Sequence, residues 1–144
     1  ARDAVLVRIG ATTAAHRRLA DRLGISDRTL FLESIPGEKL PLYYNAADLL
    51  AFPSNYEGFG LPPLEAMASG CPVVAADNSS LPEVVGRAGM LVASGDPAQW
   101  AEAIDAVLGS QTRSAELAAK GLARAREFTW ERTAEQTINA LMRM

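Results

Sequence analysis

The sequence contains little of the chemistry that disulfide or metal sites require. Its 144 residues include one cysteine, Cys71, and one histidine, His16. A single cysteine excludes an internal disulfide and fits a reducing compartment. No Cys or His spacing resembles a zinc motif. We therefore expect Cys71 to fill a small buried space and His16 to be an exposed surface residue.

Basic clusters and long apolar runs are also absent. The net charge is −3, and Arg17 and Arg18 are the only adjacent basic residues. A nucleic-acid-binding protein needs a basic face, so we expect no nucleic-acid partner. No apolar run approaches the ~18 residues of a membrane span. The N-terminal apolar stretch is short and broken by Arg8, so we expect that it is not a signal peptide.

The composition that is present is ordinary for one globular domain. The sequence is 49% hydrophobic and 22% charged, as in soluble proteins, and its length is sufficient to bury a core. We expect a single domain over residues 1–144. Because the chain begins almost directly in a strand, we expect it to be a piece of a longer protein.

Apolar strands alternate with helices five times, and further helices follow. Short apolar runs predict strands at 5–9, 29–33, 48–53, 72–76 and 90–93. Caps and helical periodicity predict helices at about 12–23, 40–47, 61–69, 80–86, 96–108, 112–127 and 129–142. Two of these helices begin with predicted capping boxes, at Ser80 and at Asp96. The order predicts an α/β, Rossmann-like fold of three layers, with a parallel sheet of about five strands and helices on both faces.

Residues 54–72 carry most of the functional information. Glu57 and Glu65 bracket a Gly-Phe-Gly turn at 58–60 that leads directly into a helix. A glycine turn at a helix start leaves backbone N–H groups unpaired, which suits a phosphate. The flanking carboxylates can accept hydrogen bonds from sugar hydroxyls. The turn follows the third strand, and ligands of parallel sheets bind at the carboxyl ends of strands, so the pattern predicts a sugar-nucleotide site.

Three other interpretations of these acids were weighed. Glu57 and Glu65 could be solvated acids favoured by the helix dipole, which suffices for Glu65 alone but does not explain the glycines around Phe59. A carboxylate pair also occurs in glycoside hydrolases, although five β-α units favour nucleotide chemistry. A phospho-acceptor signalling domain needs acids at strand ends, whereas Asp48 begins its strand.

The chain resembles the retaining glycosyltransferases of family 4, which have the GT-B fold. Residues 57–65, Glu-Gly-Phe-Gly-Leu-Pro-Pro-Leu-Glu, match that family's Glu-x7-Glu signature. Further segments similar to the family are 42–48, 53–54, 66–74, 80–85 and 128–131. The resemblance implies the C-terminal, donor-binding domain of a two-domain enzyme. In that family the last helix, here about 129–144, crosses back toward the N-terminal domain. We expect Trp130 to pack on the sheet and part of 133–144 to be poorly covered.

The resemblance also implies roles for the residues of the motif. Glu57 would be the catalytic residue, positioning the donor sugar through its hydroxyls, and Glu65 would bind the nucleotide ribose. The remaining contacts would come from backbone groups, at Gly58, Phe59, Gly60 and Leu61 for the sugar and distal phosphate, and at Ser34 and Ile35 for the base. No metal and no cofactor beyond the nucleotide-diphosphate sugar is expected.

The resemblance further implies the activity of the intact protein. It would be a metal-independent transferase of hexosyltransferase type in carbohydrate biosynthesis, moving a sugar from a UDP-, GDP- or ADP-sugar to an acceptor with retention of configuration. The acceptor would bind to an N-terminal domain. We expect a cytoplasmic protein without a membrane span, open to peripheral membrane association.

The chain by itself is expected to be less than a complete enzyme. The family's diphosphate-clamping Arg and Lys would precede residue 1, and Arg8, inside a strand, does not replace them. We therefore expect weak nucleotide binding and no activity from this chain alone, and self-association through the surface that faces the N-terminal domain in the family. The alternative is a non-catalytic nucleotide-binding or interaction module that kept the fold.

Overall fold

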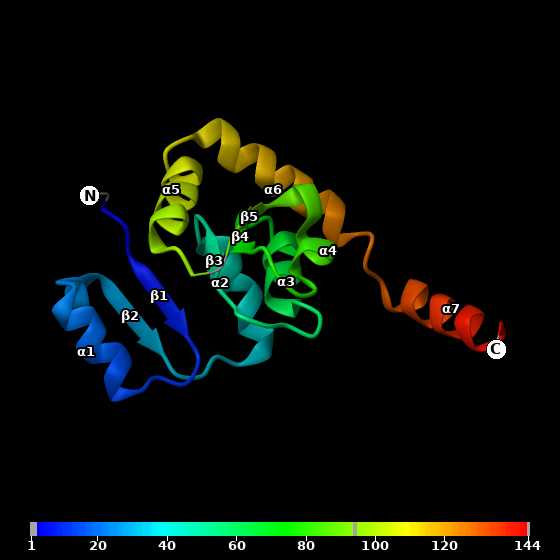
Figure 1. The fold of residues 1–144 in the computed structure, drawn as a ribbon, viewed down its shortest axis with the longest axis horizontal. Helices are drawn as coiled ribbons and strands as arrows, with labels where there is room; N and C mark the ends of the chain where they lie inside the picture. The colour runs from blue at the N-terminus through cyan, green and yellow to red at the C-terminus, as the bar shows by residue number, and fades with distance from the viewer. Residues whose placement is uncertain (1–2, 94, 144) are drawn as a thin grey trace. The chain divides into compact units, whose positions relative to one another are not determined.

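The computed structural model describes residues 3–93 and 95–143. The chain divides into two compact units, Ala1–Leu40 and Pro41–Met144. Both units contain parallel strands joined by helices, and Figure 1 labels these elements in chain order. The two units are described separately below.

The first unit is a β-α-β segment. It consists of β1 (Leu6–Ile9), α1 (Ala14–Arg22) and β2 (Thr29–Leu32). The two strands are parallel. Helix α1 begins after Thr13, whose backbone N–H donates to Nδ1 of His16 at 3.1 Å. His16 was predicted to be an exposed surface residue, but it is half-buried. Its hydrogen bond supports the start of α1. Gly24, with φ +67°, follows the helix in the left-handed conformation that commonly ends helices.

Strand β1 lies where it was predicted, but its side chains are not buried. Val7 is 44% exposed and Ile9 is 41% exposed. A sheet with helices on both faces implies a buried first strand, and this expectation was wrong, because the sheet of this unit has only two strands. A two-stranded sheet leaves one edge of each strand uncovered.

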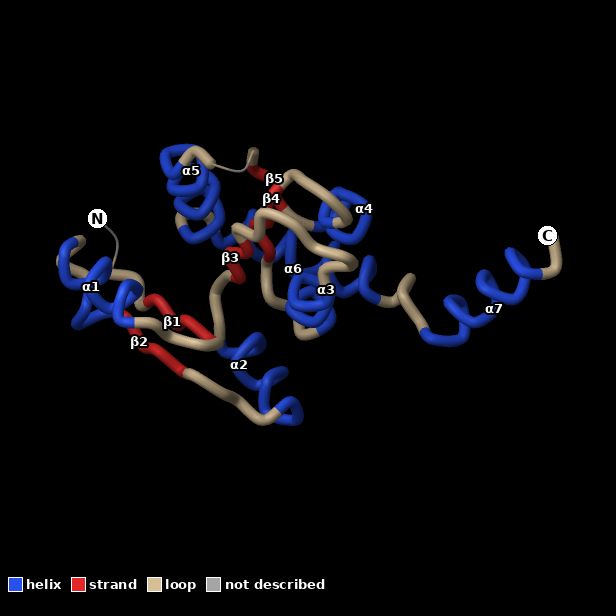
Figure 2. Tube along the Cα trace, turned by 60° about the horizontal axis from the view of Figure 1, so that its bottom comes forward, coloured by secondary structure: helices blue, strands red, loops and turns tan. Residues whose placement is uncertain are grey.

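The second unit contains a three-stranded parallel sheet in the order β3-β4-β5. Its elements are α2 (Leu40–Ala46), β3 (Leu50–Phe52), α3 (Leu61–Ala68), β4 (Val73–Ala76), α4 (Leu81–Val85), β5 (Met90–Val92), α5 (Pro97–Leu108), α6 (Gln111–Ala125) and α7 (Trp130–Leu141). Figures 1 and 2 both show the three strands side by side, with α5 on one side and α3 and α4 on the other.

The core of this unit is built around the central strand, β4. Its four residues are fully buried. Alternate side chains of a strand point to opposite faces, and Val74 packs with Val107 of α5 and Leu117 of α6. The packing of α6 on α3 is close at Gly121, where a Cβ would lie 3.2 Å from Cγ of Met67. The sheet is thus covered on both faces, as predicted.

The predicted α/β, Rossmann-like fold is confirmed, with two details that differ. All five strands are present, and they are parallel within each of two sheets, β1-β2 and β3-β4-β5, rather than paired as one continuous sheet. Trp130, expected to pack on the sheet, is 83% exposed. No residue of α7 is buried, so this helix is poorly covered, as expected for the end of the chain.

Candidate functional site

The turn before α3 depends on a glycine conformation that other residues rarely adopt. Gly60 has φ +106° and precedes the first helical residue, Leu61. A Cβ at Gly60 would lie 2.9 Å from Cδ2 of Leu81, which is fully buried. Glycine is therefore required here by both backbone conformation and space. Gly58 differs, because a Cβ there would meet nothing within 4 Å.

The start of α3 presents free backbone donors. In the part of the chain that the structure describes, the N–H groups of residues 58–61 have no hydrogen-bond acceptor. Pro62 and Pro63, which have no N–H group, occupy the first turn of the helix. The donors available to an anion are consequently those of the turn itself. Phe59 and Leu61 are exposed, so this stretch is open to a ligand.

Glu57 is held by hydrogen bonds on both its side chain and its backbone. Ser54 donates its hydroxyl to Oε1 of Glu57 at 2.8 Å. The backbone N–H of Glu57 donates to Oγ of Ser79 at 3.0 Å. Ser79 itself has φ +47°, a rare conformation for a residue with a side chain. The Glu57 carboxylate is thus half-buried and oriented at the carboxyl end of β3.

Ser80 ties the loop after β4 to the glycine turn. Its hydroxyl lies 3.0 Å from the carbonyl oxygen of Glu57 and 2.7 Å from that of Phe59. The predicted capping box at Ser80 was therefore wrong, because this side chain makes no cap hydrogen bond to α4. Asp96, at the other predicted box, does cap its helix by accepting from the Ala98 N–H at 2.9 Å.

Glu65 lies inside α3 and has a partner from another helix. The hydroxyl of Tyr44, in α2, donates to Oε2 of Glu65 at 3.1 Å. Tyr44 is only 8% exposed. Burial, the nearby Glu65 charge and this hydrogen bond raise the pKa of Tyr44, so the phenol stays protonated. The sequence gives no specific signal for this contact, because a tyrosine at helical spacing is equally suited to simple packing.

Phe59 of the turn packs on the segment between α6 and α7. Its ring meets Phe128 edge to face, with centroids 5.9 Å apart. The guanidinium of Arg124 lies 4.7 Å from the Phe128 centroid and donates to the carbonyl of Val84 at 3.1 Å. The turn is therefore supported by the end of α4 and by the C-terminal end of α6.

The predicted site residues belong to both units. Residues 57–61 and Glu65 all surround the start of α3 in the second unit. Ser34 and Ile35 lie in the loop that follows β2, in the first unit. Arg8 donates to the carbonyl groups of Gly10 and Ala11 at 2.9 and 3.0 Å, so its guanidinium is already engaged in that unit.

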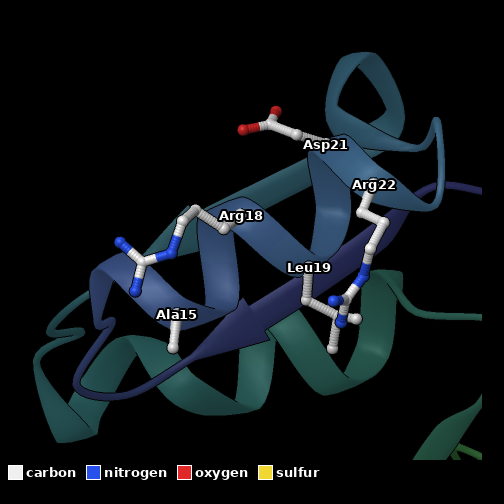
Figure 3. A pocket seen from close by; sticks show the side chains of 5 residues that line it. All are labelled: Ala15, Arg18, Leu19, Asp21 and Arg22. Carbon is white, nitrogen blue, oxygen red and sulfur yellow. The ribbon is translucent and has the colours of Figure 1, made fainter.

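One hollow, in the first unit, includes none of the predicted site residues. It has a volume of about 500 Å³ and is lined by five residues of α1 alone. Figure 3 shows Arg22 beside Leu19, whereas Asp21 points away from both. All lining residues are exposed on one helix, so this is an outer surface rather than a cleft between elements.

Two further features were searched for in the described residues, 3–93 and 95–143. No group of three or more His, Cys, Asp or Glu side chains there could hold a metal ion. No helix in that part of the chain has the length and apolar character needed to cross a membrane. Cys71 is 1% exposed, which confirms that it fills a buried space.

Comparison with known sequences finds a family model and relatives that are all described as glycosyltransferases. The family model described as glycosyl transferases group 1 matches residues 1–125. D-inositol 3-phosphate glycosyltransferase of Nocardia farcinica is 46% identical over 124 residues, which are 85% of this chain and 28% of the relative. O-antigen chain mannosyltransferase B of Escherichia coli is 46% identical over 110 residues, 76% of this chain and 29% of the relative. The chain thus spans less than a third of the curated relatives it matches.

Comparison with solved structures supports the same fold. Sucrose-phosphate synthase from Thermosynechococcus elongatus superposes with a TM-score of 0.84 at 32% identity, covering 96% of this chain and 38% of that one. Anabaena Alr3699/HepE, solved in complex with UDP, gives a TM-score of 0.86 at 26% identity, covering 98% of this chain and 41% of that one. The same Anabaena protein was also solved with UDP-glucose.

Proposed function

The chain belongs to the glycosyl transferases group 1 family, and from this premise we propose that it is the donor-binding domain of a retaining glycosyltransferase. The intact protein transfers a hexose from a nucleotide-diphosphate sugar to an acceptor held by an N-terminal domain. The observation that carries the proposal is the start of α3, where free N–H groups of residues 58–61 lie between Glu57 and Glu65.

The chemistry of this site fits a nucleotide-sugar donor. Free N–H groups and the positive end of a helix dipole attract the diphosphate. The Glu57 carboxylate, oriented by Ser54, accepts hydrogen bonds from sugar hydroxyls, and Glu65 accepts them from the ribose. Relatives support this choice of ligand, because the similar Anabaena protein binds UDP and UDP-glucose.

The same groups support transfer with retained configuration. The bond between the anomeric carbon and the diphosphate oxygen breaks, negative charge builds on the leaving diphosphate, and the sugar carbon becomes oxocarbenium-like. The N–H groups of the turn stabilise that charge because they are already aimed at the phosphate before reaction. Glu57 acts by position and electrostatics rather than as a general acid. The domain works without a metal ion.

Nucleotide titrations of the protein that contains this chain test the proposal. We expect one of UDP, GDP and ADP, and its sugar conjugate, to bind in ligand-observed NMR, with and without EDTA. Glu65→Ala is expected to lower the affinity for both ligands about tenfold or more, because one hydrogen bond to a charged group is worth about that factor. Glu57→Ala is expected to lower mainly the affinity for the sugar conjugate.

Glu102→Ala, on the exposed surface of α5, is the matched control and should change neither affinity. Absence of binding by all three nucleotides would refute donor binding and favour an interaction module. Equal losses for both ligands in both variants would instead contradict the separate roles of the two glutamates.

A further inference from the structure

The contact between Tyr44 and Glu65 joins two helices next to the proposed donor site. The phenol donates to Oε2 of Glu65 at 3.1 Å, and an ionised carboxylate can only accept, so the direction of this hydrogen bond is fixed. Tyr44 is buried, whereas Glu65 is exposed. A buried, immobile donor therefore holds one end of a carboxylate whose other end faces solvent.

The two carboxylate oxygens of Glu65 have different environments. Oε2 is occupied by Tyr44, and Oε1 has no hydrogen-bond partner within residues 3–93 and 95–143. Each oxygen offers two lone pairs. A glutamate side chain in solvent samples several rotamers, and ordering it opposes binding. The hydrogen bond from Tyr44 selects one orientation before any ligand arrives.

We propose that Tyr44 is a positioning residue for ribose recognition, which orients the Glu65 carboxylate so that its free oxygen accepts a hydrogen bond from a ribose hydroxyl. This inference rests on the proposed donor site. It adds a specificity function to a residue that does not itself touch the nucleotide. The burial that raises the pKa of Tyr44 keeps the phenol a donor at neutral pH.

A role in packing alone predicts a different result. Tyr44 also fills space in the second unit, and loss of packing would weaken every ligand of the site to the same extent. Orientation of Glu65 affects only ligands that carry ribose hydroxyls. The ratio of affinities for a nucleoside diphosphate and its 2′,3′-dideoxy form therefore separates the two roles.

The variant Tyr44→Phe removes the hydroxyl and keeps the ring. Affinities are measured by calorimetry on the protein that contains this chain, with UDP and 2′,3′-dideoxy-UDP, or with the GDP or ADP pair if wild type prefers that base. We expect Tyr44→Phe to lower the affinity for the ribonucleotide about fivefold to tenfold, the effect of losing one oriented hydrogen bond. The dideoxy ligand should bind as in wild type.

Two controls complete the test. Tyr43→Phe removes the same atom from the neighbouring residue, which is 38% exposed, and should leave both affinities unchanged. Glu65→Ala removes the acceptor and should reduce the preference for ribose, and adding Tyr44→Phe to it should cause no further loss of that preference.

The outcomes distinguish this inference from the proposed function. Equal weakening of both ligands by Tyr44→Phe, or no change in either, overturns the positioning role while the donor site stands. A full additional loss in the double variant also overturns it. If wild type binds no nucleoside diphosphate, the donor site itself is refuted.

Discussion

Replacement of Gly60 by alanine tests how the glycine turn is built. Two costs add at this position. A residue with a side chain held in the left-handed region costs about 1–3 kcal/mol, and Gly60 has φ +106°. The new Cβ would also lie 2.9 Å from Cδ2 of Leu81. Leu81 is fully buried and cannot move into solvent, so overpacking costs a further ~1–3 kcal/mol.

We therefore expect Gly60→Ala to lower the free energy of unfolding by about 2–6 kcal/mol. This is a large part of the ~5–15 kcal/mol that stabilises an ordinary domain. Urea titration of the purified chain, followed by far-UV circular dichroism, measures the change. Gly58→Ala is the matched control, because its Cβ would meet nothing within 4 Å, and it should change stability by less than ~0.5 kcal/mol.

A second substitution separates the two costs. Leu81→Val removes the atom that the new Cβ would approach, so it should be less destabilising in the Gly60→Ala background than in wild type. The strain of the left-handed backbone would remain. The argument from conformation and space at this turn is refuted if Gly60→Ala is as stable as Gly58→Ala. It is also refuted if the stability losses of Gly60→Ala and Leu81→Val are additive.

Two further predictions concern the support of the site and the buried thiol. Phe128→Ala removes the edge-to-face partner of Phe59 and should lower the free energy of unfolding by about 1–3 kcal/mol. It should also lower the affinity for the nucleotide sugar, as measured by calorimetry. Trp130→Ala, at an 83% exposed position, should do neither, and equal effects would contradict the assignment. Burial raises the pKa of Cys71 to about 11, so the folded state keeps a proton that the unfolded state loses. Stability should therefore fall by up to about 1.4 kcal/mol per pH unit as pH rises from 9 to 11. Cys71→Ala should lack that component in urea titrations, and an identical pH dependence would refute it.

The elements of secondary structure could be predicted because their signals are local. The apolar run of β4 acts over a few residues, and this strand lies where it was expected. Gly60 was also predictable as a turn residue, since a glycine before a helix start is a short-range pattern. The exposure of β1 was not, because burial depends on how many neighbouring strands pair with it.

The contacts that orient the site could not be predicted in the same way. Ser80 looked like a helix cap in the sequence, yet its hydroxyl lies within hydrogen-bond distance of carbonyl groups 21 and 23 residues away. Tyr44 meets Glu65 across 21 residues, and Phe59 meets Phe128 across four α-helices and two strands. A serine or tyrosine offers the same donor to many partners, and only the chain path selects one.

The sequence by itself determined the order of strands and helices, the glycine turn and the two glutamates, because propensity, capping and periodicity act between near neighbours. It also determined family membership, because the family model matches residues 1–125 of the sequence. Only the tertiary structure decided how those carboxylates are held. Ser54 orients Glu57 and Tyr44 orients Glu65, and the contact with Tyr44 exists only after helices from separate β-α segments have packed together.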